Sequence, residues 1–426
     1  MIKKFLFGSA FAKNIFTLVS YTALAQVINF GFNILLARIY GPSAFGALTV
    51  FTSLISFVTV VSCGKYDVAI VAAADKQDAE GLVSLGMWIT WLTAIATAIA
   101  AWVVYAVPLN FYNQSAVRHW FFVIPVSLVL LSLFQLFWMW NVREKRFNRV
   151  SFLRPLEATV NNGVALLLRG YEATGLLIGT IAGQTVSAVL IMILTIRKDG
   201  WKLVTYPVNK LTKLAAKYSE FPKINILQGF VDAIQMSIIV LVASAYFSAA
   251  EIGYYGMCMR VLQVPVRLIV LPFSHVFFAE ASETYREGKD MYGLVKRITL
   301  QTGAITIAIP IILLFAGSFL FKTIFGPQWG EAGIYAAALS PWIFFDMLRA
   351  PIVQIASILG KQKIILFLTL ASNAVLVAVI AIGLACHVNF LILLTLISIT
   401  QSLVNIAMIL VIFNMARNAT PQKPTV

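Results

Sequence analysis

The chain has 426 residues, of which 60% are hydrophobic and only 12% are charged, whereas soluble domains are about 45–50% apolar and about 25% charged. Together with a mean hydropathy of +0.88, this composition excludes a soluble globular protein, because too few polar side chains remain to face water. The formal net charge of +15 does not indicate a nucleic-acid-binding protein, since the basic residues gather in short loops between long apolar runs.

The apolar runs predict an all-α, polytopic membrane protein with twelve transmembrane helices, because each run is long enough for the roughly 20 residues that cross a bilayer. In chain order the predicted spans are residues 14–39, 44–72, 81–107, 117–141, 150–169, 175–196, 221–246, 251–279, 296–324, 331–358, 362–386 and 389–413. The first run is too long for the core of a signal peptide and is expected to remain as a span. Prolines within several spans predict kinks.

The loops between the spans differ in charge on the two sides of the membrane. One side carries basic residues in every loop and at both ends of the chain, whereas the other carries only Arg38, Arg118, Arg169 and Lys322. The positive-inside rule therefore places both termini in the cytoplasm. An even number of spans is needed to keep this alternation.

Short internal matches indicate a duplicated six-helix unit. NNGVALLL (161–168) aligns with SNAVLVAV (372–379), and Gln184 aligns with Gln401 in the same order. Two copies of six helices share one orientation, so we expect a pseudo-two-fold axis along the membrane normal and a central cavity. The predicted organisation is an N-terminal six-helix bundle at 1–200, a basic cytoplasmic linker at 201–220, a C-terminal six-helix bundle at 221–416 and a cytoplasmic tail at 417–426.

No enzymatic or metal-binding motif stands out. The sequence has no GxxxxGK[ST] phosphate loop, and the three cysteines (Cys63, Cys258 and Cys386) lie in apolar runs without metal-ligand spacing. We expect all three to be small buried side chains. Trp138 and Trp140 are expected to be anchors at the membrane interface.

Charged side chains inside the predicted spans mark the candidate sites, because each costs about 2.5–3.5 kcal/mol at a helix centre on insertion scales. They are Lys65, Arg154, Lys223, Arg260, Arg267 and Arg349, with Asp67, Glu157, Asp232, Asp346 and, at a span end, Glu280. Arg154 and Glu157 are three residues apart, as are Asp346 and Arg349, so each pair can meet on one helix face. Such pairs are either structural or part of a substrate site.

Arg260 and Arg267 are seven residues apart, which places them on one face of an ideal α-helix. Pro265 and Pro272 predict bends that would admit water. Asp232 on the preceding span can neutralise one arginine, and the remaining positive charge predicts a cavity that binds an anion. Guanidinium groups suit phosphate oxygens because they bind them with two parallel hydrogen bonds.

Three segments carry a family resemblance: LLARIYGPSAFGAL (35–48), GKYDVAIVAAADKQDAEGLVSLG (64–86) and FGPQWGEAGIYAAALSPWIFF (325–345). With the span number, loop lengths and repeat, the chain resembles the polysaccharide transport branch of the multidrug/oligosaccharidyl-lipid/polysaccharide exporter (MOP) superfamily, which includes O-antigen flippases. The resemblance implies a multi-pass protein of the bacterial cytoplasmic (inner) membrane. It would move undecaprenyl-diphosphate-linked oligosaccharides from the cytoplasmic to the outer leaflet by alternating access.

Combined with this resemblance, the intramembrane charges predict the roles of individual residues. The predicted substrate-binding residues, for the diphosphate and sugars, are Arg260, Arg267, Lys65, Arg154 and Arg349. Asp232 and Asp67 are either charge partners or sites of coupling to a proton or sodium gradient. No cofactor or metal is expected. The expected partners are the lipid-linked oligosaccharide, membrane lipids and other polysaccharide assembly proteins.

Two other classes of function compete with the flippase. A drug/cation antiporter of the same superfamily would have a similar architecture, but its cationic substrates favour an anionic cavity. A membrane polysaccharide polymerase or glycosyltransferase is disfavoured because the non-cytoplasmic loops are short.

Overall fold

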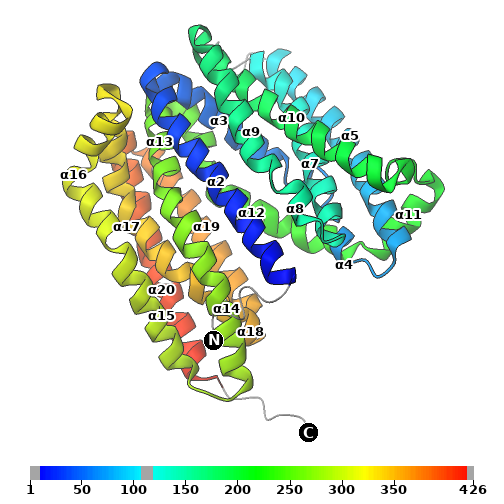
Figure 1. The fold of residues 1–426 in the computed structure, drawn as a ribbon. Coiled ribbons are helices and arrows are strands. Elements are labelled where there is room, and N and C mark those ends of the chain that lie inside the picture. The colour runs from blue at the N-terminus through cyan, green and yellow to red at the C-terminus, as the bar shows by residue number, and fades with distance from the viewer. Residues whose placement is uncertain (1–9, 107–118, 420–426) are drawn as a thin grey trace. The chain divides into compact units, whose positions relative to one another are not determined.

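The structure is a computed structural model that describes residues 10–106 and 119–419; residues 1–9, 107–118 and 420–426 lie outside the described part. Arg118 and most of the predicted cytoplasmic tail therefore fall outside it. Every regular element among the described residues is a helix (Figure 1). The all-α prediction is confirmed.

The chain forms two compact units, Met1–Ile252 and Gly253–Val426. The first contains α2 (Ala10–Ile39), α3 (Pro42–Val58), α4 (Tyr66–Ala72), α5 (Lys76–Ala106), the 3₁₀ turn η1 (His119–Val123), α7 (Ile124–Arg143), α8 (Phe147–Val150), α9 (Leu153–Leu167), α10 (Glu172–Asp199), α11 (Val208–Lys217) and α12 (Glu220–Tyr246). The predicted division into two six-helix bundles stays a prediction. The helix α12, which the prediction assigns to the C-terminal bundle, packs against α3 and α4 within the first unit.

The second unit begins within α13 (Ala249–Pro265). It continues with the π turn η4 (Val266–Val270), α14 (Leu271–Arg286), α15 (Met291–Thr306), α16 (Ala308–Phe325), α17 (Gly330–Ile352), α18 (Ile355–Ile358), α19 (Gln362–Ala385) and α20 (Phe390–Arg417).

Each predicted span has a helical counterpart, but several are interrupted. The span at 44–72 consists of α3 and α4, and the span at 251–279 consists of α13, η4 and the first part of α14. Within the described residues, eight helices are long and apolar enough to cross a membrane on length and composition alone, or nine if a bent α12 counts as one. The interrupted and charged helices fall short of that test.

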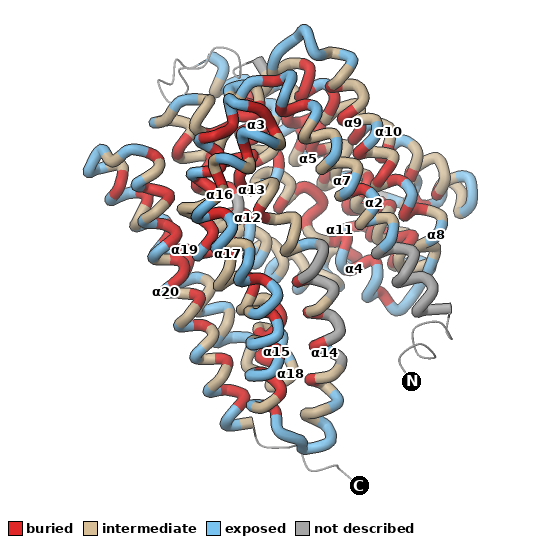
Figure 2. Tube along the Cα trace, turned by 60° about the vertical axis from the view of Figure 1, so that its left-hand side comes forward, coloured by how far each residue is buried: buried red, intermediate tan, exposed pale blue. Residues whose placement is uncertain are grey.

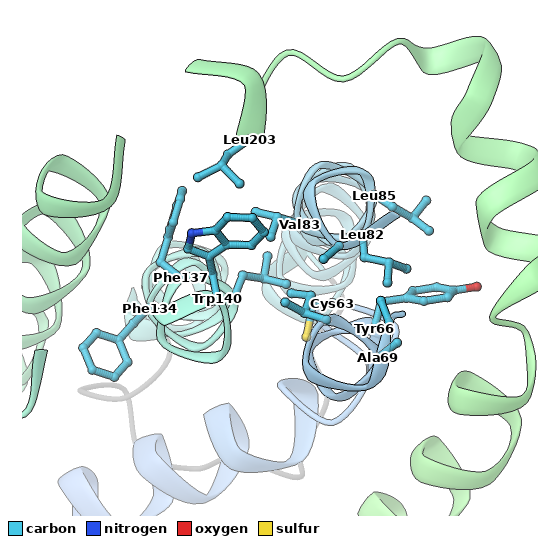
Figure 3. Close-up of a cluster of buried hydrophobic side chains, with 14 of the residues drawn as sticks. Cys63, Tyr66, Ala69, Leu82, Val83, Leu85, Phe134, Phe137, Trp140 and Leu203 are labelled. Carbon is cyan, nitrogen blue, oxygen red and sulfur yellow. The ribbon is translucent and has the colours of Figure 1, made fainter. Parts of the chain in front are cut away.

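The core of the first unit lies where α4, α5 and α7 meet. Figure 3 shows the buried side chains of these helices gathered in one cluster, with Leu203 of the linker at its edge. Trp140 is fully buried there and its indole N–H donates to Asp199 Oδ2 at 2.9 Å. The prediction that Trp140 is an interfacial anchor is therefore wrong, because this indole fills the core and its polar edge is bonded within the protein.

The linker packs on the same unit. Leu211 and Leu214 of α11 are buried in the core cluster, and the Tyr66 hydroxyl donates to the Ala215 carbonyl at 3.2 Å. The helix α11 is amphipathic, so its apolar side chains face the protein while Lys210 and Lys213 are exposed.

Exposed residues recur along several helices (Figure 2), and many of them are large and apolar. On α5, Trp88, Leu92, Ile95, Ile99 and Trp102 are each more than half exposed. A stripe of this kind on a helix is typical of a surface that faces lipid, since water would not solvate it. This pattern agrees with a multi-pass membrane protein.

The second unit has its own core at α14, α15, α17, α18 and α20, which includes Phe277, Val295 and Ile355. Cys258 is buried in α13, as Cys63 is buried in the first unit. Cys386 is exposed, so its predicted burial is wrong. It caps the end of α19, where the chain leaves the helix.

Candidate functional site

The first candidate site lies at the interruption between α3 and α4. Gly64 and Lys65 have φ angles of +60° and +56°, in the left-handed region that a lysine rarely adopts. This irregular backbone falls inside the predicted span 44–72. Irregular backbone at membrane depth is tolerated where it is buried in protein or lines a water-filled cavity, so the break is a candidate for a functional position.

Asp67 follows this break, in the first turn of α4, and is only 4% exposed. Its Oδ2 atom accepts a hydrogen bond from Gln135 Nε2 of α7 at 3.2 Å. Its Oδ1 atom accepts from Cys63 Sγ at 3.5 Å. Asp67 is predicted to be a charge partner or a coupling site. Both of these hydrogen-bond donors to it are neutral, and Gln135 is 68 residues away along the chain.

Lys65, the second left-handed residue of the break, lies close to α12. A Cβ added at Gly229 would lie 3.2 Å from Lys65 Cε and 3.5 Å from Lys65 Nζ, so the end of the lysine side chain lies close to the backbone of α12. Asp232 is one helical turn further along α12 and is exposed. The ammonium of Lys65 attracts the Asp232 carboxylate electrostatically. Lys65, Asp67 and Asp232 are thus brought to one neighbourhood of the first unit.

Arg154 lies on α9 against an aromatic pair of α7. Its Cζ atom is 4.6 Å from the Phe134 ring centroid and 5.4 Å from that of Trp138. The predicted pairing with Glu157 is confirmed, with Arg154 Nη1 3.8 Å from Glu157 Oε2. The Arg154 side chain remains 42% exposed. The cation–π contacts were missed, because Trp138 was assigned only to the membrane interface.

In the second unit, Arg260 lies in α13 and Arg267 lies where the regular α-helix is interrupted. The α-helix ends at Pro265, and Arg267 lies in the π turn that follows. Such turns occur frequently at functional sites. Arg267 Nη2 donates to Gln263 Oε1 at 2.9 Å, and Arg267 is exposed. A π turn contains more residues than an α turn, so the angle between the two arginines differs from that of the continuous helix assumed in the prediction.

Arg349 is engaged within its own helix. Its Nη2 atom lies 2.6 Å from Asp346 Oδ1, so the ion pair predicted from the spacing is confirmed. The Arg349 side chain is 18% exposed. Its Nε atom is buried without a hydrogen-bond partner among the described residues. This arginine has less capacity left for a substrate than Arg267 has.

Among the described residues, no group of three or more His, Cys, Asp or Glu side chains could hold a metal ion. Each unit has its own set of charged side chains within the predicted spans. One is the mixed-sign set of Lys65, Asp67 and Asp232 in the first unit, and the other is the arginine pair of the second unit.

Comparison with known proteins places the chain in a family. A family model described as "Polysaccharide biosynthesis protein" matches residues 35–333, about 70% of the chain. The chain belongs to this family. The predicted resemblance to a polysaccharide transport family of the MOP superfamily is confirmed. No curated protein sequence matched.

Solved structures show which fold this polysaccharide biosynthesis protein has. It is similar to an inward-facing multidrug resistance MATE family transporter of the MOP superfamily, with a TM-score of 0.71 at 13% identity over 94% of both chains. It is similar to the lipid II flippase MurJ in an inward closed conformation, with a TM-score of 0.73 at 11% identity over 92% of this chain and 86% of MurJ.

A third similar structure is a MOP superfamily transporter from Pyrococcus furiosus, with a TM-score of 0.59 at 12% identity over 97% of this chain and 98% of the transporter. Its description states that reverse polarity of its binding pocket suggests a different function. The polysaccharide biosynthesis protein therefore has the two-lobed fold of MOP superfamily transporters. These similarities fix the fold of the chain.

Proposed function

We propose that the protein is a flippase that moves undecaprenyl-diphosphate-linked oligosaccharide repeat units from the cytoplasmic to the outer leaflet by alternating access. The observation that carries the proposal is the pair Arg260 and Arg267 around the π turn of an otherwise apolar membrane helix. Membership of a polysaccharide biosynthesis family supports a glycan substrate. The similarity in fold to a lipid II flippase supports a lipid-linked one.

The chemistry of the substrate matches that of the arginines. A diphosphate that enters the membrane loses its hydration, and hydrogen bonds from guanidinium groups can replace it. Arg267 already donates to a neutral amide oxygen, that of Gln263, so its charge is not cancelled by that contact. Exposure of Arg267 leaves it accessible to a ligand.

The other charged residues support this site in different ways. Lys65, Arg154 and Arg349 are proposed contacts of the diphosphate or the sugars, with Arg349 the weakest candidate because of its ion pair with Asp346. Asp232 and Asp67 balance charge or couple transport to a proton or sodium gradient. No cofactor is needed. The protein would lie in the bacterial inner membrane with both termini in the cytoplasm, beside other polysaccharide assembly proteins.

Reconstitution in liposomes tests the proposal. Wild-type protein and the Arg260→Ala/Arg267→Ala variant are incorporated at equal density, and the transfer of a short undecaprenyl-diphosphate-linked oligosaccharide between leaflets is followed. Arg286→Ala is the matched control, because Arg286 is an exposed arginine at the end of α14. We expect flipping by the wild type and the control and its loss in the double variant.

Two results would contradict this account. If the double variant flips the substrate as fast as the wild type, the two arginines are not the substrate site, although the protein is still a flippase. No flipping by folded wild-type protein with any oligosaccharide, together with uptake of cationic drugs against an ion gradient, would favour the drug/cation antiporter.

A further inference from the structure

The short helix α4 carries Lys65 at its N-cap and Asp67 in its first turn. It is separated from α3 by seven residues that form turns and bends, 59–65, two of which are left-handed. A helix of this length would be marginal by itself, because isolated helices shorter than about 12–15 residues are marginal in water. The position of α4 therefore depends on the contacts that other helices make with it.

The carboxyl end of α4 is held by one arginine. Arg143 Nη1, in the last turn of α7, donates to the carbonyl of Ile70 at 2.9 Å and to that of Val71 at 3.4 Å. It also donates to the Ala73 carbonyl. The last carbonyls of a helix have no partners within the helix, and a cation there interacts favourably with the helix dipole. Arg143 supplies both the donors and the charge.

The amino end of α4 is held by the same helix, α7. Gln135 donates to Asp67 Oδ2 at 3.2 Å. Gln135 and Arg143 are eight residues apart, which is about 12 Å along a helix at 1.5 Å per residue. Asp67 and Ala73 are about 9 Å apart on the same estimate, so the two contacts bracket α4 along its length. Ala69 and Ile70, which lie between Asp67 and Ala73 in the sequence, are buried in the core cluster.

We infer that Arg143 is a positioning residue, which acts on Lys65 and Asp67 through α4. The sequence alone places Arg143 among the basic loop residues that indicate the topology of the chain, and predicts no other role for it. The inference rests on the proposed function only in that Lys65 and Asp67 serve transport. The position of α4 itself can be measured without a substrate.

The measurement uses Cys63, which is buried beside Asp67. In a Cys258→Ala/Cys386→Ala background, the rate of maleimide labelling of Cys63 reports opening around α4. We compare Arg143→Gln, Arg143→Lys and the control Lys145→Gln, which removes the same charge from an exposed position of the same loop. Loss of the hydrogen bonds of a charged group predicts labelling about ten-fold faster in Arg143→Gln.

Arg143→Lys keeps the charge but not the planar fork, so its labelling rate should lie between those of the wild type and Arg143→Gln. Lys145→Gln should label at the wild-type rate. If Arg143→Gln and Lys145→Gln both label as the wild type does, Arg143 does not position α4. Should Arg143→Gln fail to fold, Arg143→Lys carries the same comparison.

A double-mutant cycle then tests whether the effect of Arg143 on transport depends on Asp67. Initial flipping rates are measured for Arg143→Lys, for Asp67→Asn and for both together. We expect the Arg143→Lys defect to shrink to less than half in the Asp67→Asn background, because its effect passes through Asp67. Defects that multiply independently would overturn the link to Asp67. Faster Cys63 labelling in a protein whose wild type does not flip would uphold the positioning role and reject the proposed function.

Discussion

Each unit of the molecule contains an interrupted helix, and the two interruptions differ in what they do with charge. Between α3 and α4 the backbone turns through the left-handed Gly64–Lys65 pair, and the break brings a lysine near two carboxylates. Between α13 and α14 the helix continues through a π turn. This turn carries Arg267, and the hydrogen bond of that arginine goes to the neutral Gln263.

The charges of the two units follow the same division. Within the predicted spans, the first unit has Lys65, Arg154 and, near a span end, Lys223 with Asp67, Glu157 and Asp232, whereas the second has Arg260, Arg267 and Arg349 with Asp346. The first set is balanced and the second has two more basic than acidic residues. Because charge within a membrane is costly, the unbalanced set is the one that gains most from an anionic ligand.

The largest effect is expected from breaking the balance of the first unit. Lys65→Met leaves Asp232 without the lysine that attracts it. This should lower the free energy of unfolding, because an uncompensated charge at the centre of a membrane helix costs up to about 3 kcal/mol on insertion scales. Lys65→Met/Asp232→Asn should recover most of the loss. Thermal unfolding in detergent micelles measures both. A double variant no more stable than Lys65→Met would show that the two side chains do not balance each other.

A steric change at the same break is expected to have a smaller effect. In Gly229→Leu the new Cβ would lie 3.0 Å from Val60 Cγ1 and 3.2 Å from Lys65 Cε, so these side chains or α12 must move to make room for the leucine. Overpacking of this kind costs about 1–3 kcal/mol. Gly163→Leu is the control, since a Cβ there meets nothing within 4 Å. The same unfolding assay should separate the two variants, and equal stability would contradict the close approach of α12 to Lys65.

The smallest effect is expected at the π turn of the second unit. Gln263→Ala frees Arg267 from one hydrogen bond to a neutral partner, worth about 1 kcal/mol. We expect a change of less than about ten-fold in the initial flipping rate. Gln301→Ala, at an exposed position of α15, is the control. Complete loss of flipping in Gln263→Ala would mean that the amide itself contacts the substrate.

Contacts within one helix were predictable from the sequence, because residue spacing fixes them. The pairs Arg154–Glu157 and Asp346–Arg349 follow from a separation of three residues. The twelve helical segments follow from the apolar runs. The same reasoning gave the disturbance at Pro265, though not that it takes the form of a π turn.

Contacts between helices were not predictable in this way. Nothing in the spacing indicates that Gln135 reaches Asp67, or that Arg143, in the basic loop set that indicates topology, caps α4. A left-handed Lys65 has no sequence signal, since lysine seldom adopts that conformation. These features arise from tertiary packing, which one sequence does not specify.

The most direct test of the central claim is the affinity of each unit's variants for undecaprenyl diphosphate, measured by quenching of tryptophan fluorescence in detergent. The account predicts that Arg260→Ala/Arg267→Ala weakens binding at least about ten-fold, since each charged hydrogen bond is worth about 1.5–3 kcal/mol. The charge-neutral replacement Lys65→Met/Asp232→Asn should weaken it far less. Equal affinities for wild type and the arginine variant, or a larger loss in the first unit's variant, would contradict it.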